Sequence, residues 1–146
     1  MKKFITVVLC VAAAQFTMKA AADKPISFDQ IPAGAQSFVT DYFGNLKVAY
    51  ANVDNDGMVN RSYDVVFTNG NKIEFDRDGA WTEIDCKYTG VPAGVVPQRI
   101  NDYVVQNYPD VKILKIERDA RDYEVKLGNG LELTFDLNYN LIKIDD

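Results

Sequence analysis

Two glutamates in the middle of the chain, Glu74 and Glu83, are the first candidates for chemistry. They lie in consecutive runs of alternating polarity, 71–76 and 80–85, and a hairpin between these runs places the two carboxylates opposite each other. Paired carboxylates do acid–base work when a low-dielectric pocket raises the pKa of one of them. An open sheet face offers no such pocket, so the pair is interpreted as a solvated acidic patch, and a histidine-free hydrolase is the remote alternative.

Other catalytic residue sets are missing from the sequence. The chain contains no histidine, which excludes Ser-His-Asp and Cys-His nucleophiles and histidine-ligated zinc or iron. It also has no phosphate-binding glycine loop, dinucleotide fingerprint or cysteine cluster. The sequence therefore predicts no catalytic residues, no metal site and no cofactor, and a protein that is not an enzyme.

The acidic run 52–57 resembles part of a calcium-binding loop. A loop of the type Dx[DN]x[DN]G needs an acidic ligand six positions after its glycine, and the residue six positions after Gly57 is Tyr63. Aspartate and glycine are also common hairpin residues, so this run is interpreted as a turn. A calcium or small-ligand sensor remains the alternative function, and it would use the acidic turns at Asp54, Asp56, Asp76 and Asp78.

The elements that position these residues are repeated. The stretch 63–85 returns as 123–145, and each copy follows an amphipathic helix, at about 35–43 and 97–107. Four strand-like runs follow each helix, at about 47–53, 61–67, 71–76 and 80–85, and at about 111–117, 122–127, 131–136 and 141–145. The pattern predicts an α+β fold: two tandem α-β-β-β-β repeats form one antiparallel sheet of about eight strands, with both helices on one face.

Hairpin lengths predict which side chains face the helices. Three-residue loops ending in Gly70 and Gly130 pair Val65 with Ile73 and keep the apolar residues on one face. For the next hairpin, a two-residue turn at 78–79 pairs Phe75 with Thr82. The same reasoning pairs Phe135 with Ile142 in the second repeat.

This register turns Trp81, the single tryptophan, away from the helices, where Tyr50 is a neighbour. An exposed tryptophan is the kind of residue that anchors protein interfaces. The alternative, that Trp81 packs on a terminal segment or an adjacent strand, stays open. The predicted binding face consists of Tyr50, Glu74, Trp81, Glu83, Leu141 and Lys143.

Residues 1–22 have the features of a signal peptide. Lys2 and Lys3 precede an apolar run, and small residues end at Ala22, where we expect cleavage. This predicts a periplasmic or secreted protein without a stable membrane span, and a single domain at 23–146 whose repeats cover about 23–88 and 89–146. Cys86 is then the only cysteine, and we expect it to be buried and inert.

The charge of the exported chain argues against nucleic acid as a partner. Removing residues 1–22 takes away three of the 16 basic residues and none of the 21 acidic ones, which leaves 13 against 21, a net charge of −8. An acidic surface repels nucleic acid and anionic lipid, and the sequence has no basic cluster to reverse this locally.

With these residues placed, the chain resembles the PepSY-like family of exported bacterial proteins, which is related in architecture to the β-lactamase-inhibitor-protein fold. The resemblance lies in Ile31-Pro32 before the first helix, Asp41-Tyr42-Phe43 at its end, and the run from Tyr63 to Trp81. The second repeat departs from the pattern at Asn138-Tyr139-Asn140-Leu141. The resemblance implies inhibition of a peptidase or a β-lactamase.

Together these observations predict a non-enzymatic periplasmic binding module. It would engage a protein or peptide through the sheet face, including as an inhibitor of a hydrolase. The identity of the partner and the oligomeric state are not predicted.

Overall fold

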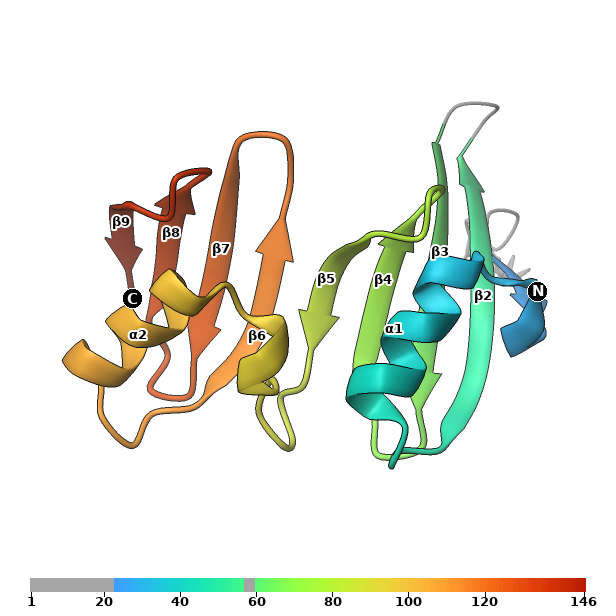
Figure 1. Ribbon diagram of the computed structural model, residues 1–146, viewed down its shortest axis with the longest axis horizontal. Helices are drawn as coiled ribbons and strands as arrows, with labels where there is room; N and C mark the ends of the chain where they lie inside the picture. The colour runs from blue at the N-terminus through green and yellow to red at the C-terminus, as the bar shows by residue number, and fades with distance from the viewer. Residues whose placement is uncertain (1–22, 57–59) are drawn as a thin grey trace, which may run out of the picture.

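The computed structural model describes residues 23–56 and 60–146, which form one sheet covered on one face by two helices (Figure 1). The strands are antiparallel and follow one another across the sheet in chain order. Their bounds are Asp23–Ile26 (β1), Val48–Asp56 (β2), Asn60–Phe67 (β3), Lys72–Asp76 (β4), Trp81–Asp85 (β5), Ile113–Arg118 (β6), Asp122–Leu127 (β7), Glu132–Asp136 (β8) and Leu141–Asp145 (β9). The helices are α1 (Ala33–Phe43) and α2 (Gln98–Asn107), and short 3-10 turns lie at Phe28–Gln30 and Ala93–Val95.

The predicted α+β fold is confirmed, with one strand more than expected. Helix α1 lies over β2 to β5 and helix α2 over β6 to β9, both on the same face (Figure 1). The ninth strand is β1, which pairs with β2. Its sequence is polar and contains a proline, so it lacks the alternating pattern that marks the other strands. The predicted signal peptide lies outside the described residues. In the part that is described, no helix is long and apolar enough to cross a membrane.

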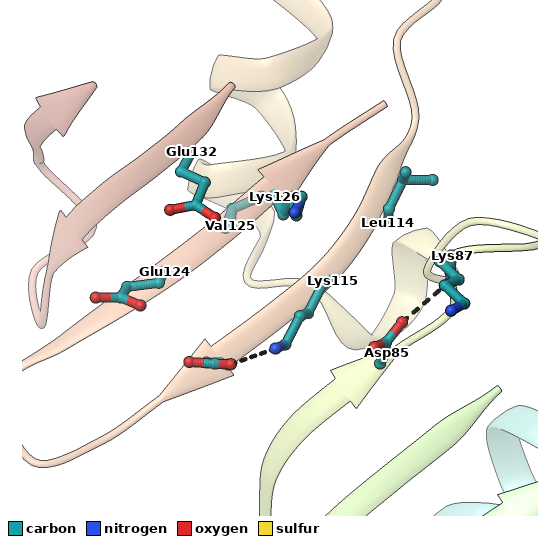
Figure 2. A pocket seen from close by; sticks show the side chains of 9 residues that line it. Asp85, Lys87, Leu114, Lys115, Glu124, Val125, Lys126 and Glu132 are labelled. Atoms are coloured by element: carbon teal, nitrogen blue, oxygen red, sulfur yellow. Dashed lines mark hydrogen bonds and ion pairs between the residues drawn. The ribbon is translucent and has the colours of Figure 1, made fainter. Parts of the chain in front are cut away.

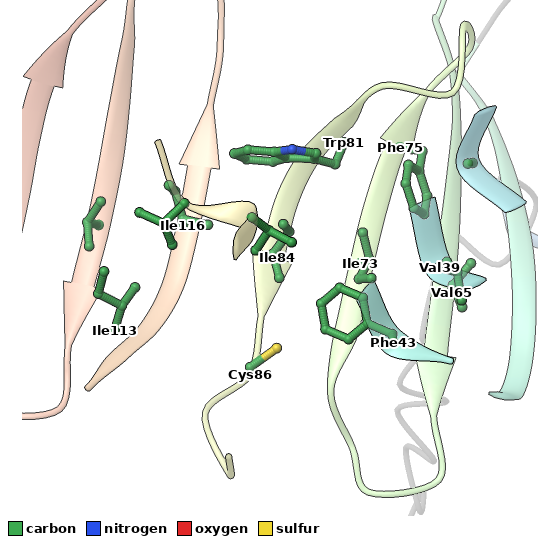
Figure 3. Close-up of a cluster of buried hydrophobic side chains, with 14 of the residues drawn as sticks. Val39, Phe43, Val65, Ile73, Phe75, Trp81, Ile84, Cys86, Ile113 and Ile116 are labelled. Atoms are coloured by element: carbon green, nitrogen blue, oxygen red, sulfur yellow. The ribbon is translucent and has the colours of Figure 1, made fainter. Parts of the chain in front are cut away.

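In each repeat an aromatic side chain of the helix packs against an aromatic side chain of the sheet. Phe43 of α1 stacks on Phe67 of β3 with ring centroids 5.5 Å apart. Tyr103 of α2 meets Phe135 of β8 edge-on at 5.6 Å. Both pairs contribute to one apolar core, which includes buried residues of both helices. Figure 3 shows a part of this core. Burial of the alternate strand residues under the helices leaves the other face of the sheet open to solvent.

The first hairpin of each repeat has the predicted register. Val65 lies opposite Ile73, and in the second repeat Val125 lies opposite Leu133. Gly70 adopts a φ of 89° at the end of its loop, and Gly130 adopts 91°. These left-handed conformations are those that a three-residue loop with a closing bulge requires.

The second hairpin of each repeat differs from the prediction, and this moves Trp81 into the core. The amide of Asp76 donates to the carbonyl of Ala80 (2.8 Å), so the loop has three residues and ends at Gly79. A bulge at Thr82 then restores the pairing further along the strand. Phe75 therefore pairs with Trp81, and the prediction that it pairs with Thr82 is wrong.

The second repeat repeats this correction. Phe135 pairs with Leu141, which packs against the core, while Ile142 is the bulged residue and is 59% exposed. The predicted outward positions of Trp81 and Leu141 are therefore wrong. Because side chains alternate between the two faces of a strand, one extra residue turns the residues on its loop side to the opposite face. The sequence pattern did not reveal this bulge.

Trp81 fills the junction between the two repeats, next to Ile84 and Ile116 (Figure 3). Only 7% of it is exposed. Arg118 of β6 covers the indole, with the guanidinium carbon 4.0 Å from the ring centroid, and its Nε donates to the carbonyl oxygen of Trp81 (2.6 Å). The tryptophan is a structural residue that joins β5 to β6.

Cys86 is fully buried just beyond β5, as the sequence predicts. Burial raises the pKa of its thiol to about 11, and the nearby Asp85 carboxylate contributes. Because the thiolate is the reactive form, Cys86 is inert at neutral pH.

Candidate functional site: an acidic row on the open face

Carboxylates from five neighbouring strands line up across the middle of the open face. Each lies directly opposite the next in the strand pairing. We call this set the acidic row, and its members are Asp64 (β3), Glu74 (β4), Glu83 (β5), Glu117 (β6) and Glu124 (β7). Like charges directly opposite each other in a sheet destabilise it, by roughly 0.2–1 kcal/mol for each pair. The fold retains four such pairs side by side.

Lysines from a neighbouring line of residues compensate part of this charge. Lys72 lies 3.3 Å from Asp64. Lys115 lies 2.6 Å from Glu117 and 3.5 Å from Glu83. These ion pairs are half exposed, so each contributes little to stability. They hold the ends of the carboxylates in place and leave the row with an excess of negative charge.

Burial and crowding change the pKa of the acidic row. Burial raises the pKa of Asp64, against the lowering effect of Lys72. Burial also raises the pKa of Glu83. The neighbouring Lys115 lowers this pKa, and the Glu117 carboxylate raises it. For Glu124, burial and then repulsion from Glu117 and other acids raise the pKa. Burial is the largest cause at all three residues, and at Asp64 and Glu83 it outweighs the lowering effect of the neighbouring lysine.

The acidic row runs beside shallow hollows in the open face. A hollow of about 210 Å³ is lined by Glu74, Glu83, Glu117 and Glu124 together with Thr82, Arg118, Asp119 and Asp122. A second hollow, of about 300 Å³, lies over β6 and β7 between Asp85 and Glu132 (Figure 2). A third, of about 350 Å³, extends from Glu124 toward Lys143. All are lined largely by charged side chains, which suits a polar partner.

The structure separates the predicted site residues into two groups. Glu74 and Glu83 lie opposite each other on the open face as expected, and Lys143 lies on the same face opposite Thr134. Tyr50 is 53% exposed at the far side of this face, on β2. Trp81 and Leu141 face the core and do not contribute to the surface.

Sequence reasoning identified the Glu74–Glu83 pair but missed the row to which this pair belongs. The missing step is the pairing of Glu83 with Glu117. These residues belong to different repeats, and no tight turn links their strands. The register of β5 against β6 therefore cannot be predicted from the length of a hairpin loop.

The acidic turns have structural roles of their own. The Asp76 carboxylate accepts hydrogen bonds from the amides of Asp78 (2.9 Å) and Ala80 (3.0 Å). Asp136 makes the same bonds in the second repeat. Asp54 lies in β2, and residues 57–59, which follow this strand in the sequence, are outside the described part. Among the described residues, no group of three or more metal-ligating side chains is placed to hold an ion.

The pKa shifts of the row predict how stability depends on pH. The folded pKa values of Asp64, Glu83 and Glu124 are raised, so the folded state binds protons that the unfolded state has released. The free energy of unfolding should therefore increase as the pH falls from 7 toward about 4.5. Lys72 does not titrate in this range. Urea unfolding at pH 7 and pH 5 measures the change.

A matched pair of variants identifies the source of this pH effect. Glu83→Gln should reduce the gain in stability at pH 5, whereas Asp41→Asn, on the exposed surface of α1, should leave it unchanged. The gain in stability is confined to pH values above about 4. Hydrogen bonds lower the pKa values of Asp119 and Asp136 in the folded state, so these two residues stabilise the fold only while they are ionised. Their contribution to the free energy of unfolding is lost when acid protonates them. A steady loss of stability from pH 7 to 4.5 contradicts this prediction.

Comparison with known proteins places the chain in a family. The family described as "Putative beta-lactamase-inhibitor-like, PepSY-like" matches residues 61–143. The chain belongs to this PepSY-like family. No curated protein matches it significantly.

Solved structures of relatives share the fold over most of the chain. One, from Bacteroides thetaiotaomicron, is described as "a putative calcium-regulated periplasmic protein"; it is 55% identical, with a TM-score of 0.83, and the match covers 85% of this chain and 97% of that one. One from Bacteroides vulgatus, described as "a putative periplasmic protein", is 55% identical with a TM-score of 0.82 over the same shares. Another from that organism, described as of unknown function, is 38% identical with a TM-score of 0.80, over 85% and 99%. All three of these relatives are described as "putative" periplasmic proteins.

Proposed function

We propose that this PepSY-like protein is a non-enzymatic periplasmic binding module. Its acidic row docks a basic segment of a protein or peptide, as an inhibitor of a hydrolase would. The observation that carries the proposal is the row itself. Five carboxylates lie opposite one another at the expense of stability, and such a local conflict in a fold is characteristic of functional surfaces.

The dimensions of the row indicate what kind of segment fits it. Five adjacent strands span roughly 19 Å, because neighbouring strands lie about 4.8 Å apart. An extended peptide that lies across the strands advances about 6.7 Å for every two residues, so arginines at four alternate positions span roughly 20 Å. Arginine also pairs with carboxylates through two parallel hydrogen bonds. An extended segment with alternating basic residues therefore suits the row.

The test uses a synthetic probe with this geometry. Calorimetry should show that the exported protein binds the peptide Arg-Ser-Arg-Ser-Arg-Ser-Arg, and that binding weakens with added salt. The double variant Glu83→Gln/Glu117→Gln should weaken binding about tenfold, since two charge pairs at the centre of the row are lost. The same variant should unfold at a higher urea concentration, because like-charge repulsion is removed.

Two controls separate a specific site from a general charge effect. The double variant Asp41→Asn/Asp102→Asn makes the same charge change on the exposed helix surfaces and should bind as tightly as the wild type. The peptide with glutamate in place of arginine should not bind. Equal binding by both double variants would refute the docking role of the row. The inhibitor role further requires that the protein slow a periplasmic β-lactamase or peptidase, and that Glu83→Gln/Glu117→Gln do so less.

Calcium regulation is the second candidate, since a relative 55% identical to the chain is described as calcium-regulated. One structural observation favours it. An oxygen of the Asp54 carboxylate is buried without a hydrogen-bond partner, and Asp54 lies opposite Asp23 in the strand pairing. In calorimetry with calcium chloride, this function requires heat of binding that Asp54→Asn abolishes. Silence at millimolar calcium removes it.

A further inference from the structure

The last strand, β9, leaves one edge of the sheet free. Among the described residues β9 pairs with β8 alone, and it lies at the opposite end of the sheet from β1 (Figure 1). Ile142 is 59% exposed and Ile144 is 48% exposed. An edge strand with free backbone groups and apolar side chains is a template for another strand.

The other edge of the sheet is protected against such pairing. Strand β1 is only four residues long and contains Lys24 and Pro25. Proline has no N–H to donate, and charged residues on an edge discourage pairing. Growth of a fibre by pairing of β9 with β1 of the next copy is therefore disfavoured. Pairing of β9 with β9 is two-fold symmetric and closes after two copies.

The hydrogen-bond pattern shows which backbone groups of β9 are free. The amide of Asp136 donates to the carbonyl of Asn140 (2.9 Å), so the even-numbered residues of β8 direct their backbone groups toward β9. Their partners across the pair are Lys143 and Asp145. Ile144, which lies between these two, therefore directs its N–H and C=O to the outer edge.

We propose that two copies of this protein associate through antiparallel pairing of β9, with Ile144 opposite Ile144 of the second copy. This register uses the free backbone groups of Ile144. It places Lys143 opposite Asp145 of the second copy, and the reverse, so that two ion pairs form on the open face. A shift that places Lys143 opposite Lys143 uses the same kind of backbone groups but opposes like charges.

The charges around β9 favour a lysine from a second copy. Asp145 lies opposite Glu132 in its own sheet, so two carboxylates face each other there. Lys143 of the same strand is 2.9 Å from Asp145 and balances one of them. A lysine from the second copy balances the other. The dimer continues the sheet across the two-fold axis and places both acidic rows on one surface. It does not depend on the proposed function.

Analytical ultracentrifugation of the protein purified from the periplasm tests this pairing. Over a range of roughly 10 µM to 1 mM, which suits a small interface, we expect a reversible monomer–dimer equilibrium. Lys143→Glu alone and Asp145→Lys alone should each raise the dissociation constant about tenfold, because each opposes like charges twice. An equimolar mixture of the two variants should associate again, since each supplies the charge that the other lacks.

The controls address folding and register. Lys47→Glu makes the same charge change before β2, far from β9, and should dimerise as the wild type does. Thermal melts establish that each variant is folded. The double variant Lys143→Asp/Asp145→Lys, which exchanges the two charges, should also dimerise. A wild type that stays monomeric up to 1 mM, or a mixture that associates no better than its two components, overturns the proposal.

Discussion

Replacement of Trp81 by alanine is expected to lower the free energy of unfolding by about 3–5 kcal/mol, the range for deletion of a large aromatic from a core. The indole is 7% exposed and fills the junction between the repeats, under the guanidinium of Arg118. Deletion leaves a cavity between β5 and β6 and removes the cation–π contact, which contributes roughly 0.5–2 kcal/mol. Urea unfolding followed by circular dichroism measures the loss.

Leu141 provides the matched control, because it occupies the equivalent position in the second repeat. It is only partly buried and lies in the edge strand of the sheet, so Leu141→Ala should cost about 1–2 kcal/mol, below the range for fully buried leucines. Equal, small losses for the two variants would mean that Trp81 does not hold the repeats together. Peptide binding by folded Trp81→Ala should be unchanged, because the indole does not reach the open face.

Gly79→Ala is expected to be the second most damaging single change, at about 2–5 kcal/mol. Gly79 has a φ of 85°, where an alanine costs roughly 1–2 kcal/mol. An added Cβ would also lie 2.9 Å from the Cβ of Pro32 and 3.1 Å from the backbone nitrogen of Ala35. Overpacking of this kind adds roughly 1–3 kcal/mol, because the start of α1 must move away from the sheet. Thermal and urea unfolding both report the effect.

Gly130 measures the backbone part of that loss without the packing part. Its φ is 91°, and no atom lies within 4 Å of an added Cβ. Gly130→Ala should therefore cost only the backbone penalty, roughly 1–2 kcal/mol. Tyr139, the counterpart of Gly79 in the second repeat, has a φ of 65°, so a side chain is accepted in this conformation where there is space. Equal losses at Gly79 and Gly130 would show that the contact with α1 is unimportant.

Much of the fold follows from local rules that a sequence displays directly. Helical periodicity, alternating polarity and the glycines at positions 70 and 130 predict the elements and the first hairpin register. The strand bounds agree to within a few residues, because each of these signals acts between neighbours in the chain. The ninth strand was missed because β1 is an edge strand, whose side chains need not alternate to satisfy a core.

The errors at Trp81 and Leu141 share one cause. The sequence shows that Gly79 ends a loop, but it does not show the bulge at Thr82 that follows, since a bulge forms where it relieves the pairing with the neighbouring strand. One unpaired residue moved the tryptophan from the predicted binding face into the core. Burial under Arg118, a residue of the other repeat, stabilises that position.

The sequence by itself determined the repeat, the two-layer α+β architecture, the inert Cys86 and the acidic character of residues 23–146, because these depend on composition and on short-range periodicity. Only the tertiary structure decided the site. Pairing of β5 with β6 joins Glu83 to Glu117, and that contact turns separate pairs of acids into one row. No turn specifies this register; it depends on the contact between the two repeats, and so it is visible only when the whole sheet is assembled.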